Sequence, residues 1–347
     1  MDTAAGWRGG QNQVLLAASG MARRGHAVAV ACRRGGELEK RLRSASLDVA
    51  ALPFAGDWSP RAAWGLARLA AAFRPDVVHA HDPHAIAAAL AVRTPRVASR
   101  RVDFPVRGPA SRWKYARCGR IVAVSRAVAD VLGRGGVDPA RVRLVYEGVP
   151  DRPPQPGGRD ALAGLGVPGD ALVVGNVAAL TDHKDHRTLL AAAALVAARE
   201  PRAWFVIVGD GELRGALEAD VQARGLQGRV SFAGFRGDLD RLIPAFDVFC
   251  LSSKMEGLGT SLLDAMCFAR PVVATAAGGI PEAVEDGVTG RVAPPGDAAA
   301  LADALALTLA DPALRAGYGA AGRARFEERF SAERMVDGTL AVYGEVA

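Results

Sequence analysis

Short apolar segments alternate with longer amphipathic segments along almost the whole chain. The short segments are rich in β-prone apolar residues and bounded by turn residues, which is typical of buried strands. The longer ones carry helix-end signals, such as Ser59-Pro60 before one helix and Gly25 after another. Strands are predicted at about 27–32, 48–52, 142–145, 204–208 and 247–253, and helices at about 11–24, 60–73, 186–198, 297–310, 312–329 and 331–345. The alternation predicts an α/β fold.

The segment 151–160, DRPPQPGGRD, interrupts this alternation. Its prolines and glycines favour neither a helix nor a central strand, so we interpret it as a linker. With 347 residues, half of them hydrophobic, the chain is long enough for two domains that each bury a core. We expect an N-terminal domain over 1–150, a C-terminal domain over 161–328 and a final helix within 329–347.

Charge and cysteine content exclude several classes of protein. The chain has 43 Lys and Arg against 37 Asp and Glu, a formal net charge of +6. This mild excess suits an anionic substrate or a membrane surface, although an ordinary basic surface explains it equally well. No zinc-finger or RNA-binding signature points to nucleic acid. Four scattered cysteines indicate free thiols in a reducing compartment. With no signal peptide and no run of about 18 apolar residues, we expect a cytoplasmic protein, peripheral at most to the inner face of the cytoplasmic membrane.

The candidate chemistry concentrates in one stretch, EGLGTSLLDAMCFARPVVATAAGGIPE. The predicted strand at 247–253 is followed by Glu256, the turn Gly257-Leu258-Gly259-Thr260 and an apolar helix. Loops at the carboxyl ends of strands in α/β sheets bind ligands, and free N–H groups at a helix start attract anions. We expect a phosphate near Gly259, with Glu256 accepting hydrogen bonds from sugar hydroxyls and Asp264 from a ribose. A solvated glutamate, a capping turn and an ordinary buried helix would explain the same pattern.

The same stretch resembles a known family. Glu256, seven residues and Asp264, followed by PVVAT and GGIPE, are similar to the acid-x7-acid signature of retaining glycosyltransferases of family 4. The resemblance extends over nearly the whole chain. It implies the glycosyltransferase-B architecture, in which two Rossmann-like domains face a cleft and the last helix crosses back onto the first domain. One departure is Asp264 itself, because the second acid is usually Glu.

The resemblance also implies roles for individual residues. His81, in the segment PDVVHAHDPH, would contact the transferred sugar, whereas we expect His79 to be a core histidine. Lys184 would bind the donor diphosphate, where an ammonium neutralises charge on the leaving group. The catalytic residues would be His81, Lys184 and Glu256, and the donor contacts Gly9, Gly10, Gly209, Asp210, Gly257, Leu258, Gly259, Thr260, Asp264 and Glu282, with Gly9 and Gly10 in a loop that faces either the diphosphate or the acceptor.

Other positions leave alternatives open. Arg100 and Arg101, expected at the mouth of the cleft, are candidates for an anionic acceptor, although a solvated loop is equally consistent. Ala179 occupies the position of a usual arginine, so either the activity is weaker or another cation, with Arg187 and Arg236 the nearest, replaces that arginine.

Two further features bear on the chemistry of the first domain. Its closing turn has Glu147 where the family usually has Asn. The histidines at 79, 81 and 84 are not accompanied by a carboxylate cluster, so we expect neither a metal nor another cofactor beyond the UDP- or GDP-linked sugar.

The N-terminus departs from the family as well. Family members begin with an apolar strand that ends at about Asp2, followed by the loop Gly6–Gly10 and a helix from near Gln11. Met1 falls at the end of that strand, so we expect the first strand to be missing from this chain. A version extended upstream would then be the more soluble one.

Together the sequence predicts a metal-independent, retaining glycosyltransferase of the hexosyltransferase type. Its partners would be a nucleotide-sugar donor and a glycan or lipid-linked acceptor, such as a lipopolysaccharide precursor or another cell-surface polysaccharide. Two alternatives remain. One is a non-catalytic protein that binds nucleotide sugars, which Ala179, Asp264 and the missing first strand would favour. The other is a sugar-nucleotide epimerase.

Overall fold

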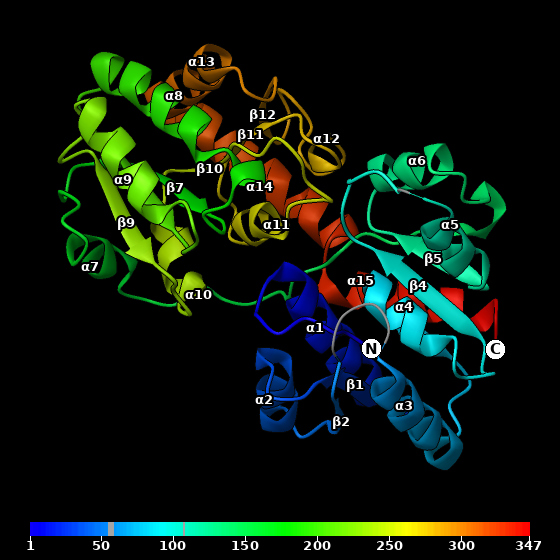
Figure 1. The fold of residues 1–347 in the computed structure, drawn as a ribbon. Coiled ribbons are helices and arrows are strands. Elements are labelled where there is room, and N and C mark those ends of the chain that lie inside the picture. The colour runs from blue at the N-terminus through cyan, green and yellow to red at the C-terminus, as the bar shows by residue number, and fades with distance from the viewer. Residues whose placement is uncertain (55–58, 107) are drawn as a thin grey trace. The chain divides into compact units, whose positions relative to one another are not determined.

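The structure is a computed structural model that describes residues 1–54, 59–106 and 108–347. These residues form two compact units (Figure 1). Unit 1 comprises Met1–Pro150 and Phe330–Ala347, and unit 2 comprises Asp151–Arg329. In each unit parallel strands alternate with helices, as the hydrophobic pattern predicts.

Unit 1 contains two parallel sheets that residues 1 and 2 connect. One sheet has the order β1-β2 and the other β3-β4-β5-β6. The strands are β1 (Ala29–Arg33), β2 (Asp48–Leu52), β3 (Val78–Ala80), β4 (Arg96–Arg100), β5 (Arg120–Ala123) and β6 (Val142–Leu144). Asp2 N donates to Ala31 O at 3.1 Å, and His81 N donates to Met1 O at 3.0 Å. Residues 1 and 2 therefore make strand-type hydrogen bonds to both sheets.

Helices cover both faces of the strands in unit 1. They are α1 (Gly9–Arg23), α2 (Glu37–Ser44), α3 (Pro60–Phe73), α4 (Pro83–Ala89), α5 (Pro109–Ala116), α6 (Arg126–Arg134) and α15 (Ala332–Gly344), with a 3-10 turn η1 (Pro139–Arg141). Val97 of β4 and Val122 of β5 pack with α1 and α15. Their chain neighbours Ala98 and Ile121, which point to the opposite face of the sheet, pack with α4, α5 and α6. This alternation is what a strand buried on both faces requires.

Unit 2 has a single parallel sheet in the order β12-β11-β10-β7-β8-β9. Its strands are β7 (Leu172–Val177), β8 (Ala203–Val208), β9 (Val230–Gly234), β10 (Val248–Leu251), β11 (Val272–Thr275) and β12 (Gly290–Ala293). Its helices are α7 (Gly158–Ala163), α8 (His186–Arg199), α9 (Arg214–Ala223), α10 (Leu239–Leu242), α11 (Thr260–Cys267), α12 (Ile280–Ala283), α13 (Ala298–Ala310) and α14 (Pro312–Arg329), with 3-10 turns η2 (Asp182–Lys184) and η3 (Ile243–Ala245). The strand order reverses between β7 and β10, which is where ligands bind in such sheets.

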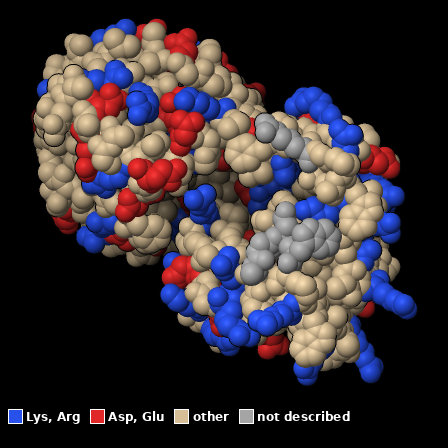
Figure 2. Space-filling view, viewed as in Figure 1, with Lys and Arg blue, Asp and Glu red and all other residues tan. Residues whose placement is uncertain are grey.

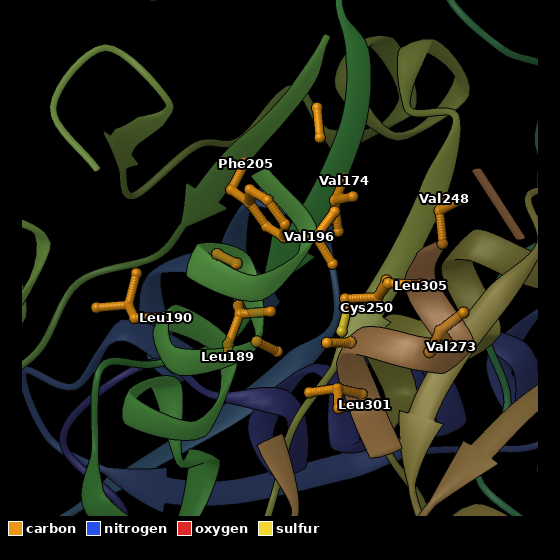
Figure 3. Close-up of a cluster of buried hydrophobic side chains, with 14 of the residues drawn as sticks. Val174, Leu189, Leu190, Val196, Phe205, Val248, Cys250, Val273, Leu301 and Leu305 are labelled. Atoms are coloured by element: carbon orange, nitrogen blue, oxygen red, sulfur yellow. The ribbon is translucent and has the colours of Figure 1, made fainter. Parts of the chain in front are cut away.

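The core of unit 2 explains why its strands are almost purely apolar. Leu189 and Val196 on α8, and Leu301 and Leu305 on α13, point toward β7, β8 and β10 (Figure 3). Phe205 on β8 is 1% exposed and belongs to the same buried cluster. Helices on the sheet faces require strands that are apolar on both sides.

Three local predictions are wrong. The first helix begins at Gly9 rather than near Gln11, and the Gln11 side chain accepts from Arg8 N just before the helix at 3.2 Å. The last three residues of the predicted linker, 158–160, belong to α7, since the prolines all precede them. The sequence of 287–297, GVTGRVAPPGD, predicts a hairpin-like loop, but the segment includes β12, which pairs in parallel with β11.

Candidate functional site

The loops after β7 and β10 meet at the carboxyl edge of the sheet in unit 2 and bring Lys184 and Glu256 together. The Lys184 ammonium forms an ion pair with the Glu256 carboxylate, which also accepts from Ser253 Oγ at 3.2 Å. Backbone contacts hold the loops in register, because Lys254 N donates to His183 O at 2.8 Å and Ser252 Oγ to Lys184 O at 3.1 Å. Both charged side chains are less than a fifth exposed. Two residues predicted to act in catalysis, 72 positions apart, are therefore in direct contact.

The glycine turn after Glu256 leads directly into α11. Gly259 has a φ of +91°, and a Cβ on it would lie 2.8 Å from Leu262 Cδ2, so a side chain there would be strained. Thr260 begins the helix, whose first N–H groups have no intrahelical acceptor. Gly257 and Leu258 are buried, and Leu258 is 0% exposed. Only the backbone of these two residues could therefore contact a ligand.

Asp264 lies in the second turn of α11 and is paired with an arginine that the sequence analysis did not select. Arg152 Nη2 donates to Asp264 Oδ1 at 2.8 Å, and its guanidinium lies 5.3 Å from the centroid of the Phe268 ring. Burial raises the pKa of Asp264, and the Arg152 cation opposes that rise. A ribose hydroxyl at Asp264 would share the carboxylate with Arg152. No motif signals this pairing, because Arg152 lies in the predicted linker.

The Gly-Asp-Gly turn after β8 fits closely against the loop that contains Ala179. A Cβ on Gly209, whose φ is +138°, would lie 1.9 Å from Ala178 O. Leu180 N donates to Asp210 O at 3.0 Å, and Gly209 N to Gly234 O at 2.8 Å. The exposed Asp210 carboxylate accepts from Gly211 N at 2.8 Å. The turn therefore fixes the backbone of the loop that holds Ala179.

The cations around that loop differ from those that the sequence suggested. Arg236 donates from Nε and Nη2 to the Asp238 carboxylate, at 2.8 and 2.7 Å. Arg187 is exposed at the start of α8. Lys254 instead forms an ion pair with Asp185 at 3.4 Å, directly beside Lys184. Sequence reasoning missed Lys254, although it stands only two residues before Glu256.

Glu282, the last predicted donor residue, lies in the short helix α12 after β11. Its carbonyl oxygen accepts from Arg325 Nη2 at 3.0 Å, and its side chain is partly exposed. The preceding turn reaches the site through Gly279 N, which donates to Glu256 O at 3.2 Å. The turn GGIPE thus supports the backbone at Glu256.

In unit 1, the two histidines at the end of β3 lie on one face of the strand, as alternation predicts. Their ring centroids are 4.0 Å apart. His79 contacts Tyr343 Oη at 2.7 Å and Ser99 Oγ at 2.8 Å, which confirms the expectation of a satisfied core histidine. Burial holds the pKa of both histidines well below the usual value. Within the described ranges no three His, Cys, Asp or Glu side chains are grouped closely enough to bind a metal ion.

The remaining residues predicted in unit 1 occupy different surroundings. Arg101 Nη1 donates to Glu147 Oε1 at 2.8 Å, and Arg101 Nη2 lies 3.0 Å from His81 Nδ1. The prediction that Arg100 lies at an open mouth is wrong, because its side chain is buried and donates to Val102 O, Phe104 O and Tyr115 Oη. Gly9 and Gly10, expected in a loop, form the first turn of α1. A Cβ on Gly10 would lie 3.7 Å from Arg101 Cδ, so this turn borders Arg101.

Both units of the chain match models of glycosyltransferase families. Residues 160–325 match the family model described as glycosyl transferases group 1, and residues 7–152 match that of glycosyltransferase family 4. A lipopolysaccharide core biosynthesis glycosyltransferase, LpsE of Rhizobium meliloti, is 34% identical over 51% of this chain and 51% of its own. A D-inositol 3-phosphate glycosyltransferase of Saccharomonospora viridis is 34% identical over 66% of this chain and 56% of its own. The chain thus spans about half the length of the curated relatives it matches.

Solved structures support the fold. HepE of Anabaena, in complex with UDP, superposes with a TM-score of 0.86 over 99% of this chain and 98% of its own, at 23% identity. A glycosyltransferase of Rickettsia africae gives the same TM-score over 99% and 97%, at 18% identity. These likenesses confirm the predicted α/β fold class with two Rossmann-like units. None of the helices in the described part of the chain is long and apolar enough to cross a membrane. The chain belongs to the glycosyltransferases that the group 1 and family 4 models describe.

Proposed function

We propose that this protein transfers a sugar from a nucleotide-sugar donor to an acceptor with retention of configuration. The observation that carries the proposal is the contact between Lys184 and Glu256 beside the glycine turn that starts α11. A cation, a carboxylate and free helix N–H groups at one edge of a sheet are what a diphosphate joined to a sugar requires. The likeness to HepE, whose structures contain UDP and UDP-glucose, favours a UDP-linked donor over a GDP-linked one.

Each residue of unit 2 would have a defined task on such a donor. The diphosphate would lie at the start of α11, with Lys184 leaving Glu256 to neutralise it and Lys254 adding a second positive charge. Glu256 would accept hydrogen bonds from the sugar hydroxyls, and Asp264, together with Arg152, would hold the ribose. The Gly209-Asp210 turn and Glu282 would border the nucleotide and the rim of the site. His81 of unit 1 would contact the transferred sugar.

Retention would follow from a same-face displacement in which the leaving phosphate takes the proton of the acceptor hydroxyl. Lys184 and the α11 dipoles would stabilise the charge that develops on that phosphate. On this proposal the reaction does not depend on a metal ion, so a chelator should leave the rate unchanged. A rate that a chelator abolishes and that added Mg²⁺ or Mn²⁺ restores would contradict this part.

The acceptor would be anionic and membrane-borne, because charge is distributed unequally between the two units. Unit 1 carries 25 Lys and Arg against 14 Asp and Glu, a net +11, and unit 2 carries 18 against 23, a net −5. On the face drawn in Figure 2, basic side chains predominate over unit 1, while both signs mix over unit 2. Trp64 on α3 and Trp113 on α5 are 64% and 46% exposed, and each lies under an arginine one turn later. Exposed tryptophans among arginines suit the headgroup region of an anionic bilayer.

The test combines binding with turnover. Thermal unfolding would be measured with UDP-, GDP- and ADP-sugars for the parent chain, Lys184→Ala and Glu256→Ala, with Lys40→Ala and Glu218→Ala as matched surface controls. We expect one donor to raise the Tm of the parent chain and of the control variants but not of the two site variants. We also expect the parent chain to release the nucleoside diphosphate when it turns over that donor. NMR of the product linkage would then report retention. A rise without turnover would favour a non-catalytic sugar-nucleotide protein, and conversion of the donor sugar without transfer would favour an epimerase.

The membrane part has its own test. Flotation with phosphatidylglycerol vesicles should carry the protein, and flotation with phosphatidylcholine vesicles should not, because attraction to basic residues requires anionic headgroups. Trp64→Ser combined with Trp113→Ser should weaken flotation, while Trp204→Phe, a tryptophan bonded inside unit 2 to Ser231 Oγ, should leave it unchanged. Equal flotation of all variants would overturn the assignment of this surface.

A further inference from the structure

The ring of His81 has a single hydrogen-bond partner among residues 1–54, 59–106 and 108–347, the guanidinium of Arg101. Arg101 Nη2 lies 3.0 Å from His81 Nδ1. A guanidinium carries N–H donors and no acceptor, and it stays protonated at any pH that a protein survives. The atom it contacts must therefore supply a lone pair. In a histidine, Nδ1 supplies one only when it carries no proton.

Glu147 holds Arg101 in the position that makes this contact. Its carboxylate accepts from Arg101 Nη1 at 2.8 Å, so neighbouring nitrogens of one planar group bind Glu147 and His81. The side chains of Arg101 and Glu147 are only 13% and 8% exposed. A partly buried, charge-assisted pair of this kind restricts the orientation of the guanidinium. Gly148 N is fixed in turn by Gln13 Oε1 at 3.2 Å, which anchors the turn that carries Glu147.

The surroundings of His81 disfavour an imidazolium. Burial, then His79 in β3 and Arg101 from the loop after β4, lower the pKa of His81. The Glu147 carboxylate accepts from the same guanidinium that contacts His81. Tyr343 of α15 contacts His79 rather than His81. The ring is neutral at physiological pH.

We propose that Arg101 and Glu147 are positioning residues that fix His81 as a neutral imidazole with its proton on Nε2. His81 then presents one N–H donor, and Nε2 has no hydrogen-bond partner among the described residues. The ligand atom that meets His81 must be an acceptor, such as a sugar hydroxyl or carbonyl oxygen. The contact with Arg101 also excludes general-base catalysis by His81 through Nδ1, because the lone pair of that nitrogen already accepts a hydrogen bond.

This inference about the ligand rests on the proposed function, whereas the inference about the tautomer does not. It also gives a structural reason for Glu147, which stands where the family usually has Asn. A neutral amide could accept from Arg101, but it would not neutralise the guanidinium. Glu147 supplies that counter-charge, so an arginine can sit against a histidine without a net positive charge in the cluster.

The first experiment reads the tautomer directly, without substrate. Long-range ¹H–¹⁵N NMR spectra of ¹⁵N-histidine-labelled protein separate Nδ1–H, Nε2–H and imidazolium forms, and His81→Gln identifies the signal of His81. We expect the Nε2–H form, unchanged as the pH falls to about 5.5, well under the usual histidine pKa of about 6.5. An Nδ1–H signal or an imidazolium at neutral pH would overturn the proposal.

Variants then test whether Arg101 and Glu147 cause this state. Arg101→Met removes the donor and the charge, so His81 should become a mixture of both tautomers with a raised pKa. Arg101→Lys, which retains one donor and the charge, should restore the Nε2–H form. Glu147→Gln should hold Arg101 less firmly, so His81 should show a partial mixture of the two neutral tautomers. Arg96→Met is the matched control, because Arg96 begins β4, the strand that precedes Arg101, but bonds to Val92 O and Arg117 O. A control variant that shifts the His81 signal as much as Arg101→Met would contradict the assignment.

Activity provides a separate readout. If the protein transfers sugar, Arg101→Met should lower kcat on the order of tenfold and move the acid limb of the pH profile upward, and Arg101→Lys should recover most of the rate. If NMR finds the Nε2–H tautomer but the protein transfers no sugar, the positioning role of Arg101 and Glu147 is supported and the proposed function is rejected. If the protein transfers sugar while His81 carries its proton on Nδ1, the proposed function is supported and the positioning role is rejected. Should Arg101→Met fail to fold, the spectrum of the parent chain and of Glu147→Gln still decides.

Discussion

The edge of unit 2 that holds Lys184 and Glu256 differs in construction from the edge of unit 1 that holds His81. In unit 2, adjacent strands β7 and β10 end side by side, and a glycine turn, a carboxylate and a helix start follow one another within a few residues. In unit 1, His81, Arg101 and Glu147 come from three separate loops, and Arg101 contacts both of the other side chains. The first edge is built mainly from one contiguous motif, which Lys184 joins from the neighbouring loop, whereas the second depends on contacts between three distant residues.

This difference teaches where substitutions should act. Lys184 and Glu256 would meet the ligand directly, so a single replacement of either should remove function while leaving the fold intact. The glycine turns and the Arg152–Asp264 pair of unit 2 also support its fold, so replacements there should lower stability. In unit 1, replacements in the network around His81 should change protonation and orientation first.

The largest effect is expected at Glu256. Glu256→Gln keeps the shape of the side chain but removes the partner of Lys184 and the charge that would meet the sugar. Transfer should fall by about 100- to 1000-fold with an unchanged Tm, because an oriented electrostatic contact is lost. Steady-state rates with saturating donor measure this. Glu218→Gln, in an exposed pair with Arg214, should have no effect. An equal loss in both variants would break the contrast.

Gly209→Ala should act through the backbone instead. With a φ of +138° and 1.9 Å between its added Cβ and Ala178 O, alanine cannot fit without moving the loop of Ala179. We expect a loss of about 2–4 kcal/mol in the free energy of unfolding, measured by urea denaturation. Gly215→Ala in α9, where nothing lies within 4 Å of the new Cβ, should be neutral or stabilise by about 0.5–1 kcal/mol. A neutral Gly209→Ala would show that this loop is less fixed than its hydrogen bonds indicate.

Arg152→Met should destabilise unit 2 in a pH-dependent manner. Asp264 has a raised pKa through burial, and Arg152 is the cation that opposes it. Without Arg152 the folded-state pKa rises further above the unfolded value, so stability is lost as the pH rises through the interval between the two. We expect a cost of about 1–3 kcal/mol near pH 7 and a smaller one near pH 4. The control Arg159→Met removes a half-exposed pair with Asp247 and should cost at most about 1 kcal/mol. A cost that grows on acidification would reverse the sign and reject the argument.

The smallest effect is expected at Ala179, and it sharpens the comparison with the family. Ala179→Arg adds a cation to the partly exposed loop after β7, beside Lys184. If the diphosphate binds there, the KM for the donor should fall by roughly two- to tenfold, because a charge pair in a partly buried site is worth up to about 1.4 kcal/mol. Arg187→Ala in the same background tests whether the native chain already relies on that exposed arginine. A KM unchanged by the first variant would place the diphosphate elsewhere.

Sequence reasoning reached much of the fold because strand and helix patterns are local. It predicted the helix start at Gly259–Thr260, because the glycine turn and the apolar helix pattern are contiguous, and it selected Lys184 and Glu256 without predicting that they contact each other. It did not find the Arg152–Asp264 pair, the burial of Arg100 or the Arg101–Glu147 pair. These contacts depend on which distant segments pack together. The sequence around an arginine does not distinguish one in a linker from one in a strand or in a site. The start of α7 inside the predicted linker was missed for a related reason, because proline-rich composition was extended past the last proline.

The interleaved boundaries of the two units have a consequence for biosynthesis. Val149 N donates to Phe330 O and Ala332 N to Val149 O, so the chain leaves unit 1 and returns to it at neighbouring points. The whole of 151–329 is therefore an insertion between two pieces of unit 1. On the ribosome, unit 2 has its complete sequence before α15 is made. The core of unit 1 contains Met335, Val336 and Val342 and cannot close until then. Nascent chains should acquire protease resistance in 151–329 first, with unit 1 exposed to chaperones for longer.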